Sequence, residues 1–490
     1  MRRHDQSIEL GALVANTPTT PYWLQTNQYG IVPKTSPAGL LIASVSSDYR
    51  YGRQPRHLTD WGYGLQVVGQ LTNASRASET SRILLAQAYA KFRLGIFEFW
   101  GGRRQQVVGL AESPLSSGSY IWSANALPLP RLEVALPNYT PVPLTRGWLA
   151  VKGFYAHGWF GNTPYVRGSY LHQKVLYVRL GKPESAVRLY GAFTHQAQWG
   201  GYAPFLAWDP RVSFDGHMPT SPEAYLWVVV PIKTQALKNL AKFTTYDQNR
   251  VGDHRGSAEA AIEVRLPHGA ITHYQQHFYD LGRKLYNFRN IEDGLYGLRF
   301  TDNRPNRLIT EAVLELFNSG SQGVIQFGKP LGGEAENYFL NGQYPDGWSY
   351  RGRTLGTPFM SQTADVNASL PAIPFTGYTK DIQRISGEYG INNNRVWAVH
   401  TGLSGALGRR WRYTTKATYS KNYGTFTARF PAGTNQFSGL VSVMRAMPWP
   451  ARSTLITSVA YDRGKLLPHD RQMGAYVAWR KTWTSAGRRR

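Results

Sequence analysis

Residues 61–72 read WGYGLQVVGQLT and show the clearest strand pattern in the chain; alternation alone would also fit a soluble β-sandwich. Every second residue from Trp61 to Leu71 is aromatic, aliphatic or glycine, and the residues between them are small or polar apart from Val68. A period of two places alternate side chains on opposite faces of a β-strand. The stretch is long for a strand of a soluble protein, and it has the length of a strand that crosses a membrane within a barrel.

The same alternation recurs along the chain. It predicts strands over 84–94, 149–155 and 175–180, and it places Leu84, Ala86 and the even-numbered residues up to Leu94 on one apolar face. The opposite faces carry Gln, Thr, Gly, Lys and Arg, which is the composition expected in a wet lumen. Apolar residues alternate again near the carboxyl end, where we expect a closing strand near 473–483; they are Met473, Ala475, Val477, Trp479 and Trp483.

The composition favours one large β domain. Tyr (30), Phe (20) and Trp (15) make up 13% of the 490 residues, and there are 49 glycines. The most apolar stretch, 224–232, is interrupted by Pro231, whereas a transmembrane helix needs about 20 apolar residues. Cysteine is absent, which excludes a cysteine-based zinc site, an iron–sulfur site and a thiol nucleophile.

The formal net charge is +25, and it is distributed unevenly. Residues 395–490 contain 17 Lys and Arg but only two acids, Asp462 and Asp470. Such an excess predicts an anionic partner: nucleic acid, anionic lipid or an acidic polysaccharide. Nucleic acid is not expected, because the basic residues alternate with apolar ones along strands and form no basic helix or compact recognition motif.

Residues 336–359 read ENYFLNGQYPDGWSYRGRTLGTPF, with no apolar run that could form a core. Aromatic faces stack on sugar rings or bases, amides bind hydroxyls, and arginine forks bind carboxylate or phosphate. The segment therefore predicts a loop that contacts a polar, bulky ligand. A structural interpretation is equally open: the aromatics pack a plug inside the barrel, with Arg351 and Arg353 paired to acids such as Glu334 or Asp346.

This segment resembles the signature of the capsule assembly family named Wzi. Further boxes similar to that family occur in order along almost the whole chain, at 20–30, 117–130, 172–174, 195–201, 252–257, 274–280, 293–297, 393–396 and 419–425; one departure lies at 318–323. The resemblance implies an all-β, transmembrane antiparallel outer-membrane barrel of about eighteen strands. Its lumen would be obstructed by loops and a small helical element.

We expect residues 1–38 to pack against or into the barrel, and residues 39–490 to form a single barrel domain. Met1 to Gln6 are followed by no apolar segment, so no signal peptide is recognisable in this chain. An outer-membrane location then requires that the signal has been removed or that the true start lies upstream.

The resemblance implies a non-catalytic protein without cofactors that binds capsular polysaccharide or exopolysaccharide and anchors it at the cell surface. Its other expected partners are outer-membrane lipid and lipopolysaccharide. An anion-selective porin is the alternative, because the same basic barrel would serve it. The residues that we predict to bind the polysaccharide are Trp348, Tyr350, Arg351, Arg353, Tyr338, Asn337 and His277.

Enzyme chemistry is weaker as an interpretation. His273 and His277 lie in a predicted strand, where residues four apart share a face but are about 13 Å apart, too far for one metal ion. Residues 402–406, GLSGA, only approach the Gly-x-Ser-x-Gly motif of hydrolases. We therefore predict neither a metal site nor catalytic residues.

Overall fold

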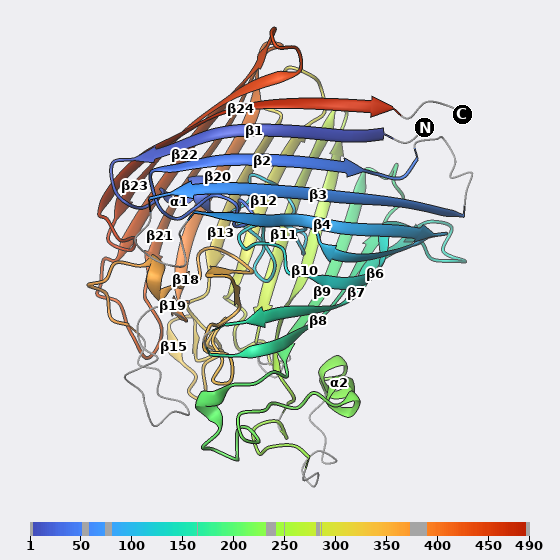
Figure 1. Cartoon of the computed structure of the whole chain (residues 1–490). Helices are drawn as coiled ribbons and strands as arrows, with labels where there is room; N and C mark the ends of the chain where they lie inside the picture. Colours follow the sequence, from blue (N-terminus) through green and yellow to red (C-terminus); the bar gives the residue numbers. More distant parts are fainter. Residues whose placement is uncertain are drawn as a thin grey trace.

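The computed structural model describes residues 3–50, 58–73, 81–163, 165–231, 242–248, 250–280, 285, 287–372 and 390–486. Eighteen antiparallel strands form one sheet that closes into a barrel (Figure 1), as the sequence predicted. The strands of this wall are β1 (Arg3–Ala15), β2 (Ala38–Ser47), β3 (Thr59–Thr72), β4 (Arg82–Leu94), β5 (Phe97–Arg103), β6 (Arg131–Pro141), β7 (Leu149–Asn162), β8 (Arg167–Leu180), β9 (Val187–Trp199), β10 (Asp253–Leu266), β11 (Gly269–Tyr279), β12 (Gly294–Asp302), β13 (Glu311–Asn318), β20 (Val396–Leu407), β21 (Trp411–Asn422), β22 (Asn435–Met447), β23 (Ser453–Gly464) and β24 (Arg471–Ala486).

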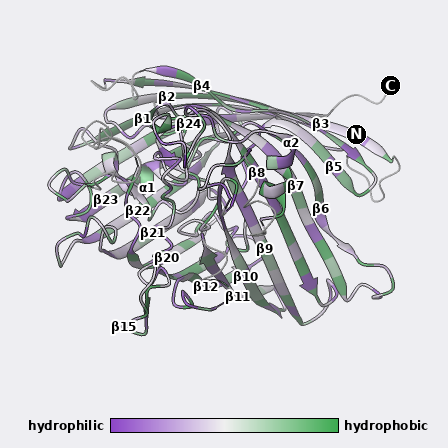
Figure 2. Cartoon of the chain, turned by 90° about the horizontal axis from the view of Figure 1, so that it is seen from below, coloured by the Kyte–Doolittle hydropathy of each residue, from purple (hydrophilic) through white to green (hydrophobic). Residues whose placement is uncertain are grey.

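The two faces of the wall differ as the alternation predicted. On β3, Trp61 and Leu71 point outward and are 49% and 71% exposed, whereas Val68 and Gln70 point into the lumen and are buried. Figure 2 shows hydrophobic and hydrophilic residues alternating along β6 and β7. An apolar outer face is what the hydrocarbon core of a membrane requires of a barrel.

One detail of the predicted pattern was wrong. Leu84 and Ala86 lie on the lumen side of β4, and Leu85 between them is exposed on the outer face. The register between β3 and β4 shifts between Gln66 and Val67, which marks a β-bulge. A bulge inserts one unpaired residue and so inverts the alternation on one side of it.

The two rims of the barrel differ in their connections. Both ends of the chain lie at one rim (Figure 1), which we call the turn rim; its connections include 95–96, 142–148, 181–186, 267–268, 303–310, 408–410 and 448–452. The opposite rim, the loop rim, carries the long connections 16–37, 104–130, 200–252, 280–293 and 319–395. Outer-membrane barrels have short periplasmic turns and longer extracellular loops, so this asymmetry is typical of them.

Three of the long connections form a plug in the lumen. The first is 16–37 with the helix α1 (Tyr22–Gln25), and the second is 104–130. The third consists of the described residues 319–372 and 390–395. It contains the 3-10 helix Thr363–Asp365 and the short strands β14 (Ile325–Gln326), β15 (Lys329–Pro330), β16 (Ser349–Tyr350), β17 (Arg353–Thr354), β18 (Ser361–Gln362) and β19 (Ile391–Asn393). Large buried side chains from all three, such as Trp23, Tyr120 and Trp348, share one apolar cluster. The lumen is thus obstructed by loops and a small helical element, as expected.

The first 38 residues divide into two parts. Arg3–Ala15 is itself a strand of the wall, β1, which pairs with β2 on one side and with β24 on the other. Only the part after Ala15 lies inside the barrel, and the division into domains stays a prediction. The connection 200–252 carries the 3-10 helix Pro204–Leu206 and the helix α2 (Pro222–Val229). Within the described ranges, no helix has the length and apolar character needed to cross a membrane.

Candidate functional site

The segment 336–359 forms the centre of the plug, with Trp348 as its most enclosed side chain. Trp348 is fully buried, and its indole Nε1 donates a hydrogen bond to the carbonyl of Ile121 at 2.8 Å. Its ring lies 6.3 Å from that of Trp122 and 5.8 Å from that of Phe160, and the guanidinium of Arg255 lies 5.1 Å from its centroid. These contacts make Trp348 a packing residue that joins the plug to the wall.

Tyr338 and His277 both contact Asp293, and Asn337 contacts the neighbouring Gln322. The Tyr338 hydroxyl donates to Asp293 Oδ2 at 2.8 Å, and His277 Nδ1 donates to the Asp293 carbonyl at 3.1 Å. The backbone nitrogen of Asn337 donates to Gln322 Oε1 at 3.2 Å. Burial raises the pKa of Asp293 to about 7. The cluster fixes the entry of the segment against β11 and the loop before β12.

Tyr350, Arg351 and Arg353 belong to the β16–β17 hairpin. Arg353 is buried and donates to Gln25 and to the carbonyl of Val32, so it holds the 16–37 segment in place. The Tyr350 hydroxyl accepts a hydrogen bond from Arg103 Nη2 at 2.9 Å. Arg351 is exposed. The carboxylate of Asp346 accepts a hydrogen bond from the Thr163 hydroxyl at 2.5 Å, and the Asp346 carbonyl accepts one from the Ser349 hydroxyl of the hairpin at 2.8 Å.

Two glycines show why the segment has this sequence. Gly347 has a φ of +70°, and a Cβ on Gly356 would lie 1.8 Å from the carbonyl oxygen of Tyr120. A left-handed φ and a close backbone approach both require glycine. Of the seven predicted binding residues, only Arg351 is exposed, Asn337 and His277 are half-buried, and the aromatic three and Arg353 are buried. The structure therefore favours the packing interpretation for the buried four.

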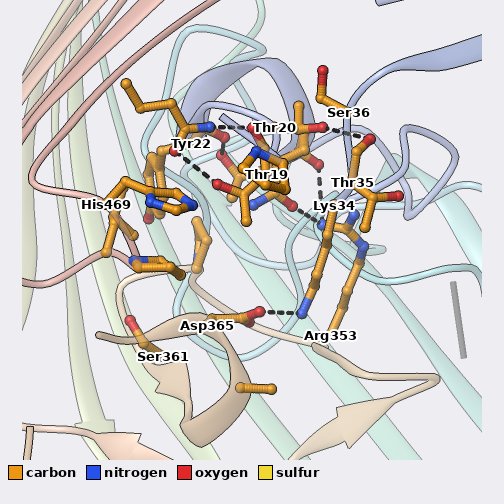
Figure 3. Close-up of a pocket in the computed structure, with 18 of the residues that line it drawn as sticks. Thr19, Thr20, Tyr22, Lys34, Thr35, Ser36, Arg353, Ser361, Asp365 and His469 are labelled. Atoms are coloured by element: carbon orange, nitrogen blue, oxygen red, sulfur yellow. Dashed lines mark hydrogen bonds and ion pairs between the residues drawn. The ribbon is translucent and has the colours of Figure 1, made fainter. Parts of the chain in front are cut away.

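A polar cavity of about 340 Å³ lies beside this hairpin at the loop rim (Figure 3). Most of its lining comes from three parts of the chain: the 16–37 segment, the stretch from β17 to the 3-10 helix Thr363–Asp365, and the β23–β24 connection. Asn73, Asn125 and Gln472 complete the lining. The lining residues drawn and labelled in Figure 3 are Thr19, Thr20, Tyr22, Lys34, Thr35, Ser36, Arg353, Ser361, Asp365 and His469. Hydroxyls, an imidazole and an ion pair in one cavity suit a hydroxylated, charged ligand.

An ion pair forms one side of this cavity. Lys34 Nζ lies 2.5 Å from Asp365 Oδ1 and donates to the carbonyl of Gly352 at 2.8 Å. The side chains of Lys34 and Asp365 are 19% and 28% exposed, so both remain accessible. Because Gly352 lies between Arg351 and Arg353, Lys34 contacts the hairpin at the residue next to the exposed Arg351.

A second cavity, of about 470 Å³, lies on the other side of α1. Tyr22 and Gln25 line the first cavity, whereas Trp23 and Leu24 line the second. The second cavity is bounded by lumen-facing side chains of β1 and β21–β24, including Glu9, Lys416 and Arg480. The helix α1 thus separates the two cavities.

Sequence reasoning found Arg353 but missed the rest of the first cavity. Lys34, Asp365 and His469 come from three connections that are far apart in the sequence, and none carries a motif of its own. One sequence feature could have indicated this cavity. The 16–37 segment is rich in Thr, Pro and aromatic residues and lacks the period of two that marks a strand. Within the described part of the chain, no group of three or more His, Cys, Asp or Glu could hold a metal ion.

No protein-family model matches the chain, and no curated protein matches it. Among solved structures, the chain is similar to Wzi of Escherichia coli, described as an outer-membrane protein involved in group 1 capsule assembly and as a carbohydrate-binding β-barrel. The TM-score is 0.55 at 12% identity, over 96% of this chain and 83% of that chain. The fold is that of an outer-membrane β-barrel.

Two further similar structures are OccAB2 of Acinetobacter baumannii and OccK9 (OpdG) of Pseudomonas aeruginosa. Their TM-scores are 0.46 and 0.45, each at 9% identity and over 99% of this chain and 98% of that chain. At such identities a likeness shows the fold alone. Membership of the capsule assembly family therefore stays a prediction.

Proposed function

We propose that this protein is a non-catalytic outer-membrane barrel that binds an acidic polysaccharide, capsular or exopolysaccharide, and anchors it at the cell surface. The observation that carries the proposal is the polar cavity at the loop rim, with the Lys34–Asp365 ion pair in its wall. The apolar outer face of the wall supports the location, because such a face is stable in lipid. The resemblance to the capsule assembly family supports the ligand class.

The chemistry of the cavity suits a sugar with an acidic group. Sugar hydroxyls can donate to Asp365 and exchange hydrogen bonds with Thr19, Ser361 and His469. A carboxylate on the polymer can bind Arg351, which is exposed next to the residue that Lys34 contacts. The buried Trp348 and Tyr338 hold this surface in position instead of contacting the sugar themselves.

One shallow site of this kind is enough for an anchor. A polymer presents the same repeating unit many times, so each chain that leaves the cavity is quickly rebound, and many proteins hold one polymer together. The basic excess of the chain adds a long-range attraction for an anionic polymer, which salt weakens.

The experiment is binding of detergent-solubilised protein to an immobilised acidic polysaccharide at low and at high salt. The variant Lys34→Gln/Asp365→Asn keeps the shape of the ion pair but removes both charges, and we expect it to bind about tenfold more weakly. Arg351→Ala should weaken binding and lower its salt dependence. The matched control is Arg429→Ala, an exposed arginine in the connection between β21 and β22, which should bind like the wild type.

If Lys34→Gln/Asp365→Asn and Arg351→Ala both bind like the wild type, the binding site lies outside this cavity. Absence of binding to any acidic glycan would refute the anchor. The anion-selective porin would then be the better explanation, and it predicts ion conductance in planar bilayers, which an obstructed lumen should not give.

A further inference from the structure

Four histidines form a row on the outer face of the wall, across β7, β8, β9 and β10. His157 is paired in register with His172, and His195 is paired with Lys174. The ring of His195 lies 5.8 Å from that of His172 and 5.1 Å from that of His254. Their strand faces are the outer ones, since Leu176 and Phe193 on the same faces are 53% and 44% exposed.

The helix α2 covers this row. His172, His195 and His254 are 0%, 3% and 1% exposed, unlike the apolar residues of the same faces. Tyr225 of α2 lies 5.7 Å from the ring of His157 and 5.9 Å from that of His172, and it stacks on Trp199 at 5.2 Å. We call α2 and the described residues next to it in the 200–252 connection (219–231, 242–248 and 250–252) the strap.

Two hydrogen bonds hold α2 on the wall, one in the middle of the helix and one at its last residue. The Tyr225 hydroxyl lies 2.6 Å from the hydroxyl of Tyr155 on β7. Lys174 on β8 donates to the carbonyl of Val229, the last residue of the helix. Ala224 and Val228 are fully buried in an apolar cluster with Trp199. The interface between α2 and the wall is therefore closely packed, and it contains both apolar contacts and hydrogen bonds.

Hydrogen bonds determine which ring nitrogen carries the proton in neutral His254 and His195. His254 Nε2 lies 2.7 Å from the carbonyl of Val251 and must donate to it. In the neutral ring, Nδ1 of His254 then accepts from Nε2 of His195, 2.9 Å away. This leaves Nδ1 of His195 as a bare acceptor, and it is buried without a partner. Both ring nitrogens of His172 are buried without a partner as well.

Among the residues that the structure describes, no carboxylate contacts these rings. The titratable groups that face them are Tyr155 and His157 of β7, Tyr170, His172 and Lys174 of β8, His195 of β9, His254 of β10, Tyr225 of α2 and Arg250 of the strap. The charged members, Lys174 and Arg250, are both cationic. Glu223, the acid of α2, forms an ion pair with Lys242.

We propose that the strap is an acid-sensitive cover, which leaves β7–β10 when the histidines beneath it bind protons. Under the closed strap, a proton on Nδ1 of His195 or on His172 creates a buried cation next to Lys174, without a counter-ion. The closed state therefore admits neutral imidazoles only. Its stability is complete above about pH 6.5, where free histidine is neutral, and falls as the pH drops below that value.

The connection that carries the strap also contacts the plug. Gln343 donates to the carbonyl of Val212 at 3.1 Å, and the Tyr344 hydroxyl donates to the carbonyl of Gly200 at 3.1 Å. Both acceptors belong to the 200–252 connection. These two contacts join the connection that carries the strap to the segment at the centre of the plug, whether or not the protein binds a glycan.

Hydrogen exchange of residues 222–229, measured on the full-length protein in detergent, tests the proposal. One imidazole that is protonated only after release favours the released state about tenfold at pH 5.5 relative to pH 7.5, and two favour it about a hundredfold. After correction for the pH dependence of intrinsic exchange, we expect protection of 222–229 to fall by that range. Protection of the wall strands should stay constant.

The variant His172→Gln/His195→Gln should lose most of this response, because glutamine does not titrate. The control His268→Gln, in the exposed turn between β10 and β11, should keep it. If the double variant does not fold, each single variant should still reduce the response about tenfold. A wild-type response under threefold, or variants that respond like the wild type, would overturn the proposal.

Discussion

Replacing Trp348 with alanine should loosen the plug and leave the wall intact. A buried tryptophan removes about 150–250 Å² of surface from water, and truncating one to alanine costs about 3–5 kcal/mol. The cost falls on the plug, because the carbonyl of Ile121 loses its donor and the rings of Trp122 and Phe160 lose a neighbour. The ladder hydrogen bonds of the wall involve none of these contacts.

Hydrogen exchange distinguishes a loosened plug from a loosened wall. The amide of residue 348 donates to Phe339, and the carbonyl of 348 accepts from Leu355. Exchange at these amides should accelerate by about two to three orders of magnitude in the variant, while strand amides keep their protection. The control is Trp61→Ala on the outer face of β3, which should leave the plug unchanged. Unchanged plug protection, or a parallel loss in plug and wall, would refute the reasoning.

Two further predictions concern the same segment. Burial raises the pKa of Asp346 to about 6, above its usual 3.8, so the acid form is favoured in the folded protein and ionisation weakens the plug as the pH rises through 6. Asp346→Asn should therefore stabilise the plug against thermal unfolding at pH 8 and make no difference at pH 4; destabilisation at pH 8 would contradict this. Gly356→Ala should displace the hairpin, because its Cβ meets a backbone carbonyl, whereas Gly352→Ala, with open space and a φ of +74°, should cost only about 1 kcal/mol in the same unfolding assay.

Part of the wall could be predicted from the sequence, because a clearly alternating strand is recognisable by itself. The alternation in 61–72 needs no partner to be recognised, and the closing strand near 473–483 was confirmed as part of β24. The strand β1 was not predicted, although Ile8, Leu10 and Val14 lie on its outer face at alternate positions, as apolar residues do on other strands of the wall. The bulge in β4 could not be seen, because it depends on the register with β3.

The site was harder to predict, because its residues meet only through the fold. The composition of 336–359 singled out the correct segment but not which of its side chains face a cavity. Burial of Tyr338 and Trp348 depends on segments more than 200 residues away along the chain, such as Tyr120 and Trp122. No local pattern reports such contacts, and the same holds for Lys34 and Asp365.

The seam between β1 and β24 sets the order in which this barrel can form. Its register runs from Arg3 opposite Ala486 to Ala15 opposite Gly474, so the first strand finds its second neighbour only when the last strand exists. Contacts so distant in sequence form slowly. The 16–37 segment joins β1 to β2, so its place in the lumen depends on β1 being held between β2 and β24. Closure of the seam therefore also fixes both ends of this part of the plug.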